Sequence, residues 1–193
     1  MRKLKHLCVF CGASTPSHAA HAQAILELGN TMLSRRIGLV YGGGRVGLMG
    51  IVAERVMAGG GTVLGVIPHQ LQRRELANLD VTELKLVDTM HERKTIMYER
   101  SDGFVVMPGG FGTLDEAMEI LTWKQLGIHD KPIVFVSIGG YFDGLAALFE
   151  RSIQDGLLKP EYRQLFAIVP SIGALFEYLD SYEPKMEGIS PWA

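Results

Sequence analysis

The 193-residue sequence has little cysteine, no long apolar run and almost no net charge. Its two cysteines cannot form the disulfide framework of a small secreted domain. A membrane-spanning helix needs about 18 or more consecutive apolar residues, and the sequence contains no such run. A formal net charge of −2 without a basic stripe argues against nucleic acid as the main partner. The hydrophobic fraction of 47% and the charged fraction of 21% are ordinary for a folded globular protein.

The first residues combine a basic start with an apolar run, as a secretory signal peptide does. The run Leu7–Cys11 is shorter than the roughly 7–15 apolar residues of such a signal, and turn-forming residues follow it directly. We therefore interpret Leu7–Cys11 as a first β-strand and expect a cytoplasmic protein.

Short apolar runs alternate with helix-length amphipathic segments along the chain. This alternation predicts an α/β fold: a single-domain, Rossmann-like, doubly wound and mainly parallel sheet with helices on both faces. We expect this domain to span residues 1–182, with a C-terminal tail at 183–193. The predicted strands are Leu7–Cys11, Ile37–Tyr41, Thr62–Ile67, Glu83–Val87 (an edge strand), Gly103–Met107, Pro132–Ser137 and the weaker Phe166–Val169. The predicted helices are Ser17–Ser34, Gly47–Ala58, Met90–Ser101, Thr113–Leu126, Tyr141–Gln154 and Ser171–Asp180.

Two glycine-rich turns follow predicted strands, where ligands of open parallel sheets bind. The first reads YGGGRVGLMG at residues 41–50, and the second reads PGGFGTLDE at 108–116. Glycine lets the backbone approach a ligand, and the helix that follows directs its N-terminal amides and partial positive charge at the same spot. Both turns are therefore candidate phosphate sites, with the Thr113 hydroxyl as a further donor. The alternative is that they are only tight turns.

Two familiar nucleotide motifs fit poorly. Gly42, Gly44 and Gly47 satisfy the GxGxxG pattern, but the next strand ends without the carboxylate that would hold the ribose of NAD. A P-loop is excluded because no Gly-Lys-Ser/Thr sequence occurs. The phosphate is therefore expected to be a monophosphate and not a pyrophosphate.

Glu116 and Arg93 are the candidate catalytic residues. The segment Thr113–Glu116 can be interpreted as a helix capping box, in which Glu116 bonds back to the helix start. The functional interpretation is that Glu116 faces the ligand, where it stabilises a cationic transition state or activates water. Arg93 lies in a basic group, Met90–Lys94, which opposes the helix dipole at a helix start. It either recognises an anion or belongs to a solvated basic face.

Other candidates are weaker. His91 and Glu92 give half of a zincin motif, whose second histidine is replaced by Thr95, so no metal is expected. His18 and His21 have no third ligand and are expected on the surface. The two cysteines have CxxC spacing, but within a strand residues three apart face opposite sides, which disfavours a redox pair.

Together these motifs resemble the LOG family of cytokinin riboside 5′-monophosphate phosphoribohydrolases. The most specific is Pro108–Glu116, which matches the family's PGGxGTxxE. It is joined in the family's order by YGGG at 41–44 with GLMG at 47–50, MHERK at 90–94 and TWKQLGIH at 122–129. Departures are small: Ala13 stands where serine is common, Phe111 where tyrosine is common, and SIGG at 137–140 where NVDG is usual.

The resemblance implies hydrolysis of the N-glycosidic bond of AMP or an N6-modified AMP to a free base and ribose 5-phosphate. It also implies a homodimer that needs no metal or organic cofactor. It makes Arg93 and Glu116 catalytic. It implies that the residues contacting substrate are Glu75, Lys94, Gly110, Phe111, Gly112, Thr113, Leu114, Asp115 and Thr122. From the glycine turns themselves, we expect Gly42, Gly43 and Gly44 to join the second turn and Thr113 in holding the 5′-phosphate.

The expected chemistry agrees with these roles. Breaking the bond gives the ribose oxocarbenium character, which a neighbouring carboxylate such as Glu116 stabilises. Arg93 has a pKa above about 12 and cannot donate the proton, so it orients Glu116 or the ribose. The proton source for the leaving base stays open. Two alternatives remain: a nucleotide sensor or carrier on the same fold, and the lysine decarboxylase that older family labels suggest. The latter would need pyridoxal phosphate and a Schiff-base lysine, with Lys94 and Lys124 as the candidates.

Overall fold

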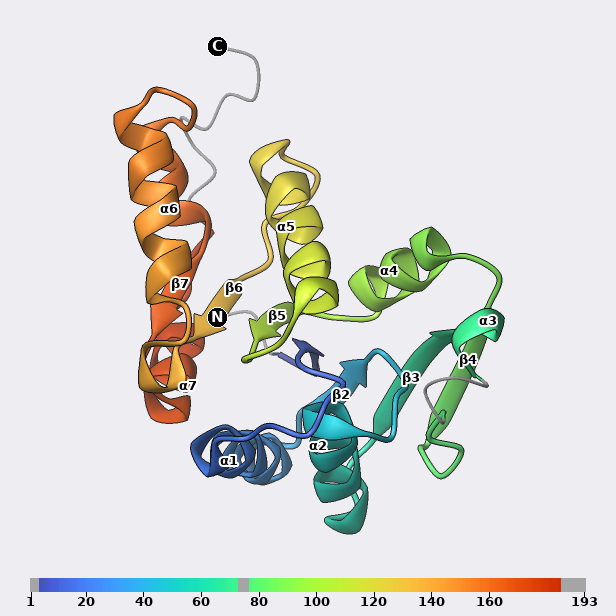
Figure 1. Ribbon diagram of the computed structural model, residues 1–193. Helices are drawn as coiled ribbons and strands as arrows, with labels where there is room; N and C mark the ends of the chain where they lie inside the picture. Colours follow the sequence, from blue (N-terminus) through green and yellow to red (C-terminus); the bar gives the residue numbers. More distant parts are fainter. Residues whose placement is uncertain (1–3, 73–76, 185–193) are drawn as a thin grey trace.

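The computed structural model describes residues 4–72 and 77–184 and contains a seven-stranded sheet whose neighbouring strands are all parallel (Figure 1). The strand order is β4-β3-β2-β1-β5-β6-β7, so β1 lies in the middle. The strands are β1 (His6–Phe10), β2 (Gly38–Tyr41), β3 (Val63–Pro68), β4 (Glu83–Val87), β5 (Gly103–Val106), β6 (Ile133–Val136) and β7 (Ala167–Val169).

Helices cover both faces of this sheet and create two hydrophobic cores. Successive side chains of a strand point to opposite faces, so Leu7 and Val9 enter one core, while Cys8 and Phe10 enter the other. The first core is closed by α1 (Ala19–Arg35), α2 (Gly47–Ala58) and α7 (Ile172–Ser181). The second is closed by α4 (Met90–Glu99), α5 (Phe111–Gln125) and α6 (Asp143–Gln154). Short helices occur at α3 (His69–Gln72), η1 (Ile138–Gly140) and η2 (Pro160–Leu165).

The predicted α/β class and doubly wound sheet are confirmed. Each predicted strand exists, and β4 has the predicted bounds. Helix starts differ by up to two residues: α5 begins at Phe111 and not at Thr113, because Gly110 is the N-cap residue. The chain continues past α7 to residue 184. The predicted tail at 183–193 falls almost entirely outside the described residues, so that division stays a prediction.

The two cysteines are free and buried. Cys8 belongs to one core and Cys11 to the other, as expected for residues three apart at a strand. Burial, reinforced by the negative charge of Glu116, raises the pKa of both thiols. A thiol that resists ionisation is a poor nucleophile, so this placement supports packing and not redox chemistry.

The strand order places a topological switch point beside β1. The chain leaves β1 toward β2 on one side, and β5 pairs with β1 on the other. Loops that leave the carboxyl ends of β1 and β5 therefore diverge and open a crevice, which is where ligands of such sheets bind.

Buried His129 makes the stability of this fold depend on pH. Its Nε2 lies 2.9 Å from the carbonyl oxygen of Ile120, and its Nδ1 accepts a hydrogen bond from the backbone N–H of Lys131 at 3.1 Å. Both ring nitrogens are thus satisfied only in the neutral form. Burial, assisted by the charges of Lys124 and Lys131, lowers the pKa of His129 to about 4.

We expect the free energy of unfolding to fall as the pH falls from about 6.5 to about 4, by up to about 3 kcal/mol from this residue. The sign follows because the unfolded chain takes up the proton throughout that window while the folded chain does not. Urea unfolding at pH 7 and at pH 4 measures the change. A His129→Gln variant should lose this part of the dependence, and equal dependence in both proteins would contradict the account.

Candidate active site

A cavity of about 530 Å³ opens at the carboxyl edge of the sheet, at the switch point. Its walls are the loop after β1, the loop after β5, the first turns of α1, α2, α4 and α5, and Tyr141, which follows β6. The lining residues are Cys11, Gly12, Ala13, Ser14, Thr15, Pro16, Ser17, His18, His21, Leu48, Met49, Arg93, Pro108, Gly109, Gly110, Gly112, Thr113, Glu116 and Tyr141.

The N-terminus of α5 faces this cavity without a capping side chain. Gly110 is the N-cap residue and offers no side-chain hydrogen bond, so the first-turn amides are left for a ligand. Gly112 and the buried Thr113 line the cavity. An uncapped helix N-terminus carries a partial positive charge and aligned N–H donors, which suit a phosphate group.

The two loops are locked together beside this helix end. The backbone N–H of Gly12 donates to the carbonyl of Pro108 at 3.0 Å. A Cβ at Gly109 would overlap the hydroxyl of Thr113 and crowd the amide of Gly12, so this position requires glycine. The hydroxyl of Tyr141 donates to the carbonyl of Gly109 at 2.6 Å. Contacts within the protein therefore hold the two loops and the start of α5 together.

Glu116 lies one turn further along α5, on the same cavity wall. Because α5 begins at Phe111, Glu116 is inside the helix, and the capping-box interpretation of Thr113–Glu116 is wrong. The residue is only 8% exposed, and its Oε1 lies 3.4 Å from Nη2 of Arg93. A carboxylate and a guanidinium thus form a nearly buried pair next to the anion site.

Arg93 holds this pair to the sheet. Its Nε donates to the carbonyl of Val66 at 3.0 Å, and its Nη2 donates to that of Gly42 at 3.2 Å. These carbonyls lie at the ends of β3 and β2, so one side chain joins two strand ends to Glu116. Arg93 is 6% exposed, and the interpretation as a solvated basic face is wrong for it.

The first glycine turn serves Arg93 and not the cavity. A Cβ at Gly42 would overlap Nη2 of Arg93. The carbonyl of Gly43 accepts a hydrogen bond from the backbone N–H of Asn78. Neither these glycines nor Gly44 lines the cavity. The amides at the start of α2 donate to the carbonyl of Gly12 and are therefore engaged within the protein. Of the two glycine-rich turns, the second is therefore the one that leaves a helix N-terminus open to the cavity.

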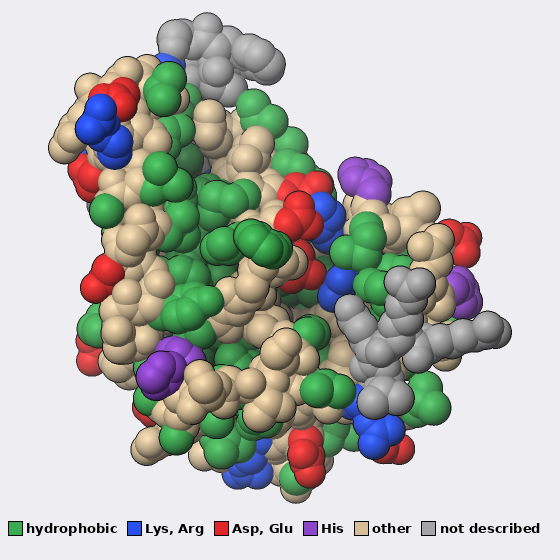
Figure 2. Space-filling view, in the orientation of Figure 1, with side chains coloured by type: hydrophobic (Ala, Val, Ile, Leu, Met, Phe, Trp, Pro, Cys, Tyr) green, Lys and Arg blue, Asp and Glu red, His purple; other side chains and the backbone are tan. Residues whose placement is uncertain are grey.

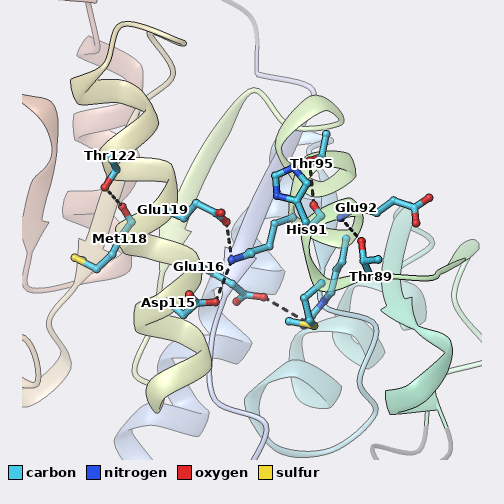
Figure 3. Close-up of polar contacts among 12 residues, drawn as sticks. Thr89, His91, Glu92, Thr95, Asp115, Glu116, Met118, Glu119 and Thr122 are labelled. Atoms are coloured by element: carbon cyan, nitrogen blue, oxygen red, sulfur yellow. Dashed lines mark hydrogen bonds and ion pairs between the residues drawn. The ribbon is translucent and has the colours of Figure 1, made fainter. Parts of the chain in front are cut away.

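Lys94 belongs to an ion-pair cluster that joins α4 to α5. Its Nζ lies 3.3 Å from Oδ2 of Asp115 and 2.8 Å from Oε2 of Glu119. Figure 3 shows these carboxylates, with Glu116, reaching from α5 toward α4, and Figure 2 shows the charged side chains gathered there. Burial works against the ammonium, but the hydrogen bonds to both carboxylates outweigh it and raise the pKa of Lys94.

Of the remaining predicted substrate contacts, those among the described residues are not part of the cavity lining. Phe111 is 94% exposed, and Leu114 packs against the second core. The Thr122 hydroxyl donates to the Met118 carbonyl at 2.7 Å, further along α5 (Figure 3). Glu75 lies outside the described residues. Of the predicted set, the cavity brings together Arg93, Glu116, Gly110, Gly112 and Thr113.

Sequence reasoning missed one wall of the cavity. His18, His21 and Tyr141 line it, although the histidines were expected on the surface. His18 is exposed at the N-cap of α1, whereas His21 is partly buried. Their position just after β1, at the same sheet edge as the glycine turns, is the signal that could have found them.

No lysine is among the lining residues of the described chain, which bears on the decarboxylase alternative. Lys94 is engaged by two carboxylates, and Lys124 is 2% exposed, with its Nζ 2.9 Å from the Tyr182 hydroxyl. Pyridoxal phosphate needs a lysine in its pocket for a Schiff base. The residues present do not fit that cofactor.

The fold and the cavity define a class: a Rossmann-like α/β protein with an uncapped helix N-terminus beside a nearly buried carboxylate–guanidinium pair. Comparison with known proteins makes this specific. The family model described as possible lysine decarboxylase matches residues 49–179. A cytokinin riboside 5′-monophosphate phosphoribohydrolase from Arabidopsis thaliana is 42% identical over 188 residues, which is 97% of this chain and 88% of that protein. A probable enzyme of the same name from Oryza sativa subsp. japonica is 44% identical over 185 residues, 96% and 83% of the two chains.

The chain belongs to this LOG family, and the resemblance found in the sequence is confirmed. Solved structures agree on the fold. A molybdenum cofactor carrier protein from Chlamydomonas reinhardtii superposes with a TM-score of 0.68 at 20% identity, over 93% of this chain and 97% of that one. A molybdenum cofactor binding protein from Rippkaea orientalis gives 0.67 at 19%, over 94% and 98%. At such identity the likeness shows the fold alone.

Proposed function

We propose that the protein hydrolyses the N-glycosidic bond of AMP or an N6-modified AMP, giving the free base and ribose 5-phosphate. The observation that carries this proposal is the placement of Glu116, paired with Arg93, one helical turn from the uncapped N-terminus of α5 in a single cavity. A nucleoside monophosphate has a dianion and a glycosidic bond separated by one ribose, and the cavity offers one group for each.

The reaction follows from this arrangement. The 5′-phosphate binds the first-turn amides of α5 and Thr113, which places the ribose beside Glu116. As the bond between C1′ and the base nitrogen breaks, the carboxylate of Glu116 stabilises the oxocarbenium-like ribose and orients water toward C1′. Water supplies a hydroxyl to C1′ and a proton to the departing base. Arg93 positions Glu116 and takes no part in proton transfer, because a guanidinium stays charged.

Chromatography of the purified protein with AMP, and separately with N6-isopentenyladenosine 5′-monophosphate, tests the proposal. We expect free base and ribose 5-phosphate in equal amounts, and the two rates rank the bases. Tight nucleotide binding without base release would contradict hydrolysis and support a carrier or sensor.

We also propose that the protein is a homodimer that acts in the cytoplasm. An apolar groove of about 340 Å³ runs between α5, α6 and η2, and Figure 2 shows the hydrophobic side chains that gather between α5 and α6. Thr122 lines this groove and not the cavity, which fits a substrate contact made across an interface. Two free buried thiols suit a reducing compartment. No helix within residues 4–72 and 77–184 is long and apolar enough to cross a membrane.

A further inference from the structure

The cavity has a second polar wall, which comes from α1 and not from α5. The reaction described above does not use it. His18 and His21 come from the start of α1, and their rings lie 5.8 Å apart. The His21 ring also meets the edge of the Tyr141 ring at 5.5 Å. Because the Tyr141 hydroxyl is bonded to the carbonyl of Gly109, this contact joins His21 to the loop that carries the anion site.

The hydrogen-bonding state of His21 indicates which ring nitrogen carries the proton. Its Nδ1 is buried and has no hydrogen-bond partner. A buried N–H without an acceptor costs more than a bare ring nitrogen, so the neutral tautomer keeps its proton on Nε2. Burial, followed by the charge of His18, lowers the pKa of His21 and favours this neutral form. The ring therefore presents an N–H donor at Nε2, its other nitrogen.

The N-terminus of α1 adds a partial positive charge to the same wall of the cavity. His18 is the N-cap residue of this 17-residue helix, yet its side chain makes no capping hydrogen bond, and the first turn carries no acidic residue. The cavity is thus lined by the N-termini of two helices and by two imidazoles. Hydrogen-bond donors and the partial positive charges of two helix N-termini suit a phosphate dianion.

We propose that His21, supported by His18, is a specificity-determining residue of the phosphate subsite, where its Nε2–H donates to an oxygen of the 5′-phosphate. This proposal deepens the proposed function and rests on it for the identity of the substrate. It divides the cavity into a phosphate end, at His21 and the start of α5, and a glycosidic end at Glu116 and Arg93.

The test compares His21→Phe, which keeps an aromatic ring against Tyr141, with His21→Gln, which keeps a donor. Loss of a hydrogen bond to a charged group should raise KM for AMP about 10- to 100-fold in His21→Phe, while kcat falls much less. His21→Gln should recover part of the loss. His6→Gln is the matched control. His6 is the first residue of β1 and lies at the amino ends of the strands, whereas the cavity lies at their carboxyl ends. Thermal unfolding of each variant confirms that it is folded.

Product inhibition separates a phosphate contact from a general disturbance of the cavity. In His21→Phe we expect the inhibition constant of ribose 5-phosphate to rise at least about 10-fold, and that of adenine to stay within about twofold. Equal changes for both products, or no change for either, would overturn the proposal. If the wild-type protein releases no base, the proposed function fails by itself. Calorimetric titration of ribose 5-phosphate and of inorganic phosphate into wild type and His21→Phe then still tests the subsite.

Discussion

Replacing Glu116 with glutamine is expected to lower kcat for base release by about 10³-fold or more, while AMP still binds. Glutamine keeps the size of the side chain and a hydrogen-bonding oxygen for Arg93, so the pocket retains its shape. It removes the negative charge that the oxocarbenium-like ribose requires. Because phosphate binding depends on the start of α5, the affinity for AMP should change by only a few-fold.

Steady-state kinetics and calorimetric titration of AMP measure these two effects separately. Glu177→Gln serves as the control, since Glu177 is exposed on α7 and lines no part of the cavity. A Glu116→Gln protein that turns over at a rate close to wild type would show that another group stabilises the ribose.

Replacing Arg93 with methionine is expected to reduce both activity and stability. The substitution leaves the Glu116 carboxylate without its 3.4 Å partner and withdraws the donors from the carbonyls of Val66 and Gly42. Removing one partner of a buried ion pair costs about 3–5 kcal/mol in unfolding free energy. The rate should fall about 10²-fold or more, because Glu116 is no longer held toward the ribose.

Two further variants separate the contributions of Arg93. Arg93→Lys keeps the charge but cannot reach three acceptors at once, so it should be intermediate in both measurements. In the double variant Arg93→Met with Glu116→Gln, the stability loss should be smaller than the sum of the single losses, because no unpaired charge remains. Urea unfolding of the wild-type protein, of the three proteins altered at Arg93 and of Glu116→Gln measures these losses. Wild-type stability in Arg93→Met would contradict a structural role for the pair.

The sheet and the proximity of Glu116 to Arg93 could be predicted from the sequence because both follow from local patterns. Buried strands such as Val63–Pro68 appear as short apolar runs, and groups that follow their carboxyl ends meet at one edge of a parallel sheet. Glu116 and Arg93 are 23 positions apart in the chain, yet each lies in the first or second turn of a helix that follows a strand. Both were therefore expected at the same edge of the sheet.

The structure changes three local interpretations, two of them through contacts between distant segments of the chain. The start of α2 resembles a phosphate site, but the Gly12 carbonyl occupies its amides. The segment Thr113–Glu116 resembles a capping box, but Gly110 begins the helix earlier. His21 resembles a surface residue of α1 until Tyr141, 120 positions later, packs against its ring.

The central claim is that one cavity binds the phosphate at the start of α5 and cleaves the glycosidic bond at Glu116. The most direct test compares kcat/KM for base release from AMP and from adenosine with the wild-type protein. The account predicts a preference for AMP of about 10³-fold or more, because a site built around a charged group leaves its donors unpaired when that group is missing. Release of adenine from adenosine at a comparable rate would contradict it.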